Sequence, residues 1–137
     1  MDKLRVLHVI GGGEFGGAER HILNLAAALD PAEVSVAVAC LFARPFADMA
    51  REAGLEAYAF PMRYKTDFRV VGRLVELTRE GGFHLVHTHG VRANLIGRLA
   101  ARRAGRQPEN RTGQPHKTHR QKWARDYHHT HRQYFLY

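Results

Sequence analysis

Hydrophobic residues over the first hundred positions alternate between short continuous runs and runs with helical spacing. The continuous runs have the length and apolar content of buried strands and occupy residues 4–10, 34–42, 55–60 and 83–89. Between and after them, apolar residues recur every three or four positions, which predicts helices that begin near residues 17, 46, 68 and 90. Strands that alternate with helices are typical of a parallel sheet joined by right-handed crossovers.

The helical spacing also predicts which side chains face the sheet. They are Ala18, Ile22, Leu25 and Leu29 in the first helix, Phe68, Val71, Leu74, Val75 and Thr78 in the third, and Ala93, Ile96, Leu99 and Ala100 in the fourth. We therefore expect an α/β fold, a Rossmann-like doubly wound parallel sheet, over residues 1–105.

The candidate site of such a fold lies where the winding reverses. In the common strand order 3-2-1-4, this point is at the carboxyl ends of the first and fourth strands, where ligands bind. Two loops should meet there across one crevice. They are GGGEFGG at residues 11–17 and HTHG at residues 87–90.

The glycine-rich loop, residues 11–17, contains five glycines in seven positions and leads directly into a helix. Glycine has no Cβ, so a ligand can approach this backbone closely. The free N–H groups and the positive dipole end of the following helix favour an anion, most often a phosphate. We interpret the loop as a phosphate site.

A dinucleotide is one alternative ligand for this loop, because Gly11, Gly13 and Gly16 fit the G-x-G-x-x-G pattern. NAD enzymes place an acidic residue at the end of the second strand, where this chain has none. Arg44 follows that strand and could favour a 2′-phosphate. An NADP-binding oxidoreductase domain therefore stays open as an alternative.

Two histidines in HTHG, His87 and His89, are two residues apart and point to the same side of a strand. A metal site would need further ligands, and no Cys, Asp or Glu cluster completes one in the sequence. We therefore predict no metal. His89, at the end of the strand, is the better placed to orient a substrate hydroxyl or take its proton near neutral pH.

The C-terminal stretch, residues 106–137, differs from the rest of the chain. It holds seven Lys or Arg against two acidic residues, and it shows no apolar period. Such a segment cannot bury enough surface to fold, so we predict a disordered basic tail. Its richness in Arg, Gln, His and Pro suggests a stretch of DNA read out of frame.

Nucleic-acid binding through this tail is a second alternative function. Aromatic residues that could stack on bases lie between its arginines, namely Trp123, Tyr127, Tyr134 and Phe135. Binding by a disordered basic tail would be nonspecific and would weaken steeply with salt. We therefore expect no specific nucleic-acid partner.

Other features indicate a cytoplasmic protein. Cys40 is the only cysteine and lies in an apolar run, which predicts a buried, inert thiol and a reducing compartment. The N-terminal apolar segment runs into glycines and does not resemble a signal peptide, and no run approaches the ~20 residues of a membrane-spanning helix. Peripheral attachment to the inner face of the membrane stays open.

The chain resembles the N-terminal domain of family 4 glycosyltransferases. The resemblance rests on VLHVIGGGEFGGAERHILNLAAAL and on the strand ending VHTHG with its helix VRANLIGRLAARRAG, and it covers residues 1 to about 105. It implies a retaining enzyme of the GT-B fold, in which this domain mainly binds the acceptor and a second domain holds the nucleotide-sugar. The nucleotide-sugar is a substrate, so no cofactor is implied.

The resemblance also implies roles for individual residues. The backbone of Gly16 and Gly17 would bind the donor diphosphate, and His89 would be catalytic, near the transferred sugar. The implied acceptor, a glycan or a lipid-linked molecule, would contact Glu19, Lys65, Arg92 and Asn94.

The chain departs from the family after about residue 105. The last strands of the domain and the whole donor-binding domain are not recognisable in it, so we predict a fragment that is inactive alone. The fourth strand would then form an exposed apolar edge through which copies of the chain could associate.

Overall fold

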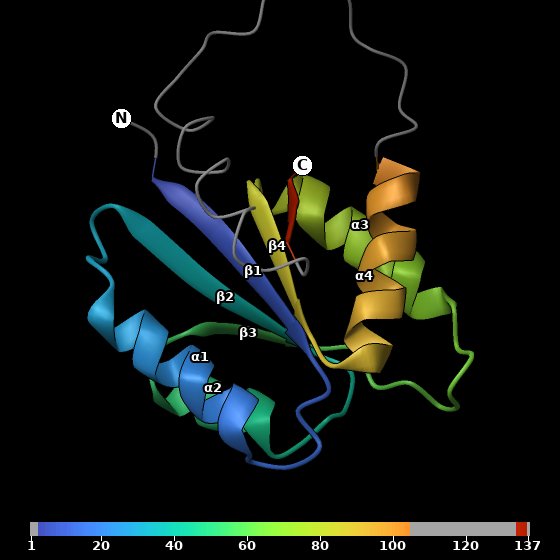
Figure 1. Ribbon diagram of the computed structural model, residues 1–137, viewed down its shortest axis with the longest axis horizontal. Helices are drawn as coiled ribbons and strands as arrows, with labels where there is room; N and C mark the ends of the chain where they lie inside the picture. Colours follow the sequence, from blue (N-terminus) through green and yellow to red (C-terminus); the bar gives the residue numbers. More distant parts are fainter. Residues whose placement is uncertain (1–2, 105–133, 137) are drawn as a thin grey trace, which may run out of the picture.

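The computed structural model describes residues 3–104 and 134–136, which form a sheet covered by helices on both faces (Figure 1). The strands follow the order β3-β2-β1-β4-β5 across the sheet. They are β1 (Leu4–Ile10), β2 (Val34–Cys40), β3 (Glu56–Ala59), β4 (Leu85–His89) and β5 (Tyr134–Leu136). β1 to β4 are parallel, and the predicted order 3-2-1-4 is confirmed.

Two helices cover each face of the sheet. α1 (Gly17–Ala28) and α2 (Phe46–Glu52) lie on one face, and α3 (Arg69–Glu80) and α4 (Val91–Ala104) lie on the other (Figure 1). The predicted doubly wound α/β fold is confirmed. In the described ranges, no helix is both long enough and apolar enough to cross a membrane.

The alternation of side chains along the central strands divides the core in two. Leu7 and Val9 of β1 pack with α3 and α4, whereas Ile10 packs with α1 and α2. Apart from His8, the buried residues on both faces of β1 and β2 are therefore apolar, which is why their sequences are nearly continuous hydrophobic runs. Cys40 is buried in the core beneath α2, and burial raises the pKa of its thiol to about 12, as expected of an inert cysteine.

The predicted inner face of α3 is confirmed except at Phe68. This side chain is 48% exposed, because α3 begins at Arg69 and Phe68 lies just before its first turn. Val70 is buried in its place, together with the predicted Val71 and Leu74. In α4, Gly97 is buried together with the predicted Ala93, Ile96 and Ala100, whereas Leu99 is only partly buried.

The edge of the sheet differs from the prediction. β5 pairs antiparallel with β4, with Leu136 opposite Leu85 and Tyr134 opposite His87. The prediction that β4 is an exposed edge is therefore wrong between Leu85 and His87. The self-association expected through that edge no longer follows for these residues. β5 also belongs to the tail predicted to be disordered, and the rest of that prediction lies outside the described residues.

Gly72 offers a test of the assignment of α3. It lies on the exposed face of the helix, and a Cβ added there would meet no atom within 4 Å. Because glycine in a helix interior is less favourable than alanine, Gly72→Ala is expected to raise the free energy of unfolding by about 0.5–1 kcal/mol. Urea unfolding followed by circular dichroism measures this change, and a loss of stability would contradict an exposed helical position.

Candidate functional site

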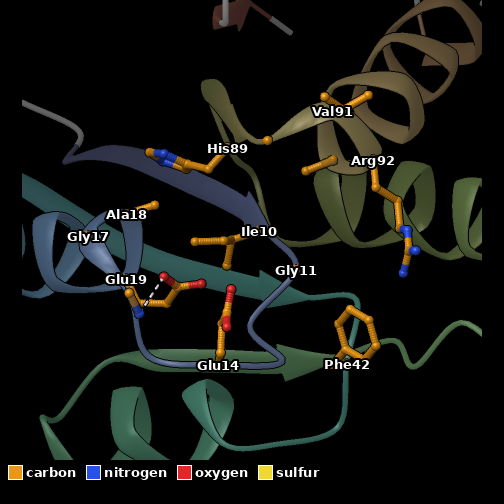
Figure 2. Close-up of a pocket in the computed structure, with 13 residues that line it drawn as sticks. Ile10, Gly11, Glu14, Gly17, Ala18, Glu19, Phe42, His89, Val91 and Arg92 are labelled. Carbon is orange, nitrogen blue, oxygen red and sulfur yellow. Dashed lines mark hydrogen bonds between the residues drawn. The ribbon is translucent and has the colours of Figure 1, made fainter.

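An open cavity of about 500 Å³ lies at the carboxyl ends of β1 and β4 (Figure 2). One wall is the glycine-rich loop with the first turn of α1, and the other is the turn from His89 into α4. The two loops that the sequence places at one crevice therefore do face each other. Phe42, which follows β2, lines the same cavity.

The glycine-rich loop is held against the second strand by its backbone. The carbonyl of Gly11 accepts hydrogen bonds from the N–H groups of Leu41 and Phe42, at 3.0 and 2.9 Å. The carbonyl of Gly12 accepts one from the N–H of Phe46 at 3.2 Å. Gly12 has a φ of 73°, a left-handed conformation that favours glycine. The loop thus has a defined path before α1 begins.

Glu19 lies in the first turn of α1 and is only 7% exposed. Its Oε2 accepts a hydrogen bond of 3.0 Å from the N–H of Gly16, so the carboxylate caps the helix. Gly16 and Gly17 both line the cavity, as expected of a phosphate site, but the N–H of Gly16 already has this partner. Glu19 also lines the cavity.

Glu14 projects from the loop toward the same space as Glu19 (Figure 2). Carboxylates accept hydrogen bonds from hydroxyl groups, whereas the start of a helix favours an anion. The wall formed by α1 and its loop therefore places two carboxylates beside the start of the helix.

Of the two residues on α4 that were predicted to bind the acceptor, one lies on the opposite wall. Arg92 lines the cavity with its guanidinium carbon 5.3 Å from the centre of the Phe42 ring, a cation–π contact at the rim (Figure 2). Asn94 is not among the lining residues in the described part of the chain. Its Oδ1 accepts a hydrogen bond from the hydroxyl of Thr88, so this side chain fixes the start of α4.

Lys65 and Arg44 lie away from this cavity. Lys65 is exposed in the loop before α3, where Asp67 accepts hydrogen bonds from the N–H of Arg63 and from Arg69. These bonds hold the pKa of the Asp67 carboxyl well below its usual range. Arg44 lines a neighbouring hollow beside the glycine-rich loop and pairs with Asp48 at 3.1 Å.

A cluster of histidines lies beneath the cavity, on the face of the sheet that α1 covers. His8 of β1 is directly opposite His87 of β4, and its Nδ1 is 2.9 Å from the Nε2 of His89. His8 and His87 are buried, and His89, which lines the cavity, is half-buried. The His21 ring on α1 is 6.4 Å from that of His89.

Burial keeps two of these imidazoles neutral at pH 7. It lowers the pKa of His8 well below its ordinary value, and the neighbouring His87, His89 and His21 lower it further. The pKa of His89 falls to about 4, first through burial and then through His21, while Glu19 opposes the shift. A neutral imidazole can accept a proton or a hydrogen bond, or donate one hydrogen bond.

The sequence analysis missed His8. The predicted strand order already made its strand the neighbour of the HTHG strand, and both strands end at the same edge of the sheet. His89 is the last residue of its strand, and His8 lies two residues before the end of the neighbouring strand, with its side chain on the same face of the sheet. The strand order and the alternation of side chains along a strand could therefore have predicted that the two histidines lie close together. The prediction of no metal rested on the lack of a third ligand, and His8 is a candidate third ligand.

Comparisons with known proteins show the family and the fold of the chain. The family profile described as Glycosyl transferase 4-like domain matches residues 16–136. Among solved structures, the chain is similar to HepE from Anabaena, crystallised in complex with UDP, with a TM-score of 0.57 and 20% sequence identity. The match covers 75% of this chain and 28% of the HepE chain, so the chain spans less than a third of that protein. A comparison with curated proteins gives no match.

The match of the family profile extends over most of the chain, and it agrees with the resemblance to glycosyltransferases rather than with the oxidoreductase and nucleic-acid alternatives. The fold, a partial match to a GT-B glycosyltransferase, is consistent with it. The chain therefore belongs to the glycosyl transferase 4-like family, as the resemblance implies.

Proposed function

We propose that this chain forms one wall of the active site of a retaining glycosyltransferase, which transfers a sugar from a nucleotide-sugar to a glycan or lipid-linked acceptor. The observation that carries the proposal is the crevice itself, where the start of α1 and His89 lie on opposite sides of one cavity. The complex of the structurally similar HepE with UDP supports a nucleoside diphosphate as part of the ligand.

In this proposal the two walls bind different parts of the substrates. The backbone at Gly16 and Gly17 faces the donor diphosphate, and the carboxylate of Glu14 accepts hydrogen bonds from sugar hydroxyls. His89 forms a hydrogen bond with the transferred sugar or the attacking hydroxyl. Arg92 contacts the acceptor at the rim, where its stacking on Phe42 keeps it near the opening.

Catalysis by the 137 residues alone is not expected. Glycosyl transfer develops positive charge on the sugar and negative charge on the leaving diphosphate, and groups on both sides of the ligand must stabilise these charges. The cavity described here is open to solvent, so its two walls do not surround a bound ligand. The proposed location is the cytoplasm, at the inner face of the membrane where the acceptor is lipid-linked.

Binding of UDP, followed by amide NMR, tests the proposal. We expect UDP to shift the amide resonances of Gly16 and Gly17 together with those of Gly90 and Arg92. In Gly17→Ala we expect the affinity to fall about tenfold, equivalent to about 1.4 kcal/mol, because the added methyl group would stand between the ligand and the backbone. A Cβ at Gly17 meets no protein atom within 4 Å, so the fold should be retained.

Gly72→Ala is the matched control, because it makes the same chemical change on a helix far from the cavity. It should leave the affinity for UDP unchanged. Absence of any shift at the crevice, or equal affinities in the two variants, would contradict the proposed diphosphate site. NADPH, titrated in the same way, should produce no comparable shifts.

A further inference from the structure

The histidine cluster beneath the cavity has the composition of a metal site. Each of His8, His87 and His89 offers a ring nitrogen, and these three nitrogens lie within 4.8 Å of one another. They come from two hydrogen-bonded strands, so the backbone of the sheet fixes their spacing. Three imidazoles without an acidic ligand are a set that binds Zn²⁺ and its neighbours in the transition series, whereas Mg²⁺ and Ca²⁺ prefer oxygen.

The buried ring of His8 is the second observation. Within the described residues, its Nε2 has no hydrogen-bond partner, although it is excluded from solvent. The other nitrogen, Nδ1, lies beside the Nε2 of His89. Because imidazole always carries at least one N–H and buried polar atoms are nearly always paired, such an orphaned nitrogen calls for an explanation.

We propose that His8, His87 and His89 bind one divalent cation of the zinc class beside the crevice. In a tetrahedral site with Zn–N bonds of about 2.0–2.1 Å, ligand nitrogens are about 3.3 Å apart. The three nitrogens of the set lie within 4.8 Å of one another. Rotation of the rings about their side-chain torsions would bring the three nitrogens closer to that spacing.

The surroundings of the cluster are compatible with a cation. His89 lines the open cavity, which gives an ion a route from solvent and leaves a fourth position for water or a ligand oxygen. Glu19 interacts electrostatically with His89, and its negative charge favours a cation there.

The test uses the untagged full chain, because five further histidines in residues 116–131 could bind metal on their own. These residues are His116, His119, His128, His129 and His131. A variant with all five changed to Gln is titrated with Co²⁺, followed by its visible absorption, and with Zn²⁺, followed by calorimetry. We expect one equivalent to bind and the melting temperature to rise by several degrees with Zn²⁺.

Substitutions in that background locate the site. His87→Asn and His89→Gln should each weaken binding at least tenfold, whereas His84→Gln should not, because His84 lies before β4 and accepts a hydrogen bond from the N–H of Arg5. Circular dichroism checks that each variant is folded. Retention of affinity in both His87→Asn and His89→Gln would overturn the proposal, as would failure of the tail variant to bind either ion.

Long-range proton–nitrogen spectra of the imidazole rings give a readout that needs no substitution in the cluster. Addition of Zn²⁺ to the tail variant should shift one ring nitrogen in each of His8, His87 and His89. It should leave the nitrogens of His21 and His84 nearly unchanged. Unchanged nitrogens in the cluster would show that the three rings only pack against one another. This test does not depend on the proposed glycosyltransferase activity.

Discussion

Phe46→Ala is expected to lower the free energy of unfolding by about 3–5 kcal/mol, because it removes a ring that is fully buried. Phe46 begins α2 and packs in the core between that helix and the sheet. Domains of this size have a total stability of about 5–15 kcal/mol, so the loss would remove a large part of it. Urea unfolding followed by circular dichroism measures the change.

The effect should extend to the glycine-rich loop. The N–H of Phe46 donates a hydrogen bond to the carbonyl of Gly12, and its ring centre is 6.3 Å from that of Phe15 in the loop. We therefore expect the amide resonances of Gly16 and Gly17 to shift or broaden in Phe46→Ala, and the binding of UDP to weaken.

Leu74→Ala is the control for Phe46→Ala. Leu74 is equally buried but lies on α3, in the core on the other face of the sheet. Leu74→Ala should lower the free energy of unfolding by about 2–5 kcal/mol, a loss similar to that of Phe46→Ala. It should leave the amide resonances of the glycine-rich loop unchanged. Equal perturbation of the loop by both variants would show that the loop responds to overall stability and not to its contact with Phe46.

Much of this fold could be predicted because its core strands are buried on both faces. Such strands produce continuous apolar runs, and a regular alternation of strands with helices leaves few topologies. The strand order 3-2-1-4 then placed the glycine-rich loop opposite His89. The architecture of the crevice was therefore accessible from the sequence.

The details of the site were less accessible, because they depend on individual contacts. Periodicity gave no sign that Glu19 turns back to cap its own helix or that Arg92 stacks on Phe42. It also could not show β5, because three residues far along the chain pair with β4 through their backbone. His8 was hidden for a different reason, since a single polar residue in an apolar run is usually read as part of the core.

Gly12→Ala is the second change with a large expected effect, a loss of about 2–5 kcal/mol in the free energy of unfolding. A left-handed φ costs a residue with a Cβ about 1–2 kcal/mol, and Gly12 has a φ of 73°. The added Cβ would also lie 3.0 Å from the Sγ of Cys40 and 3.3 Å from the Cβ of Phe46. Overpacking of a buried site typically costs about 1–3 kcal/mol.

Gly54→Ala separates these two costs. Gly54 has a similar φ of 83°, but a Cβ there would meet nothing within 4 Å, so its substitution should show only the backbone cost. The additional loss of stability in Gly12→Ala, compared with Gly54→Ala, then measures how tightly the loop is packed against β2 and α2. Replacing Cys40 with alanine should reduce this additional loss, because it removes the contact with Sγ. Equal losses of stability at Gly12 and Gly54 would mean that the loop can move away from Cys40 at little cost. Such a loop could not hold Gly16 and Gly17 in a fixed position for a diphosphate.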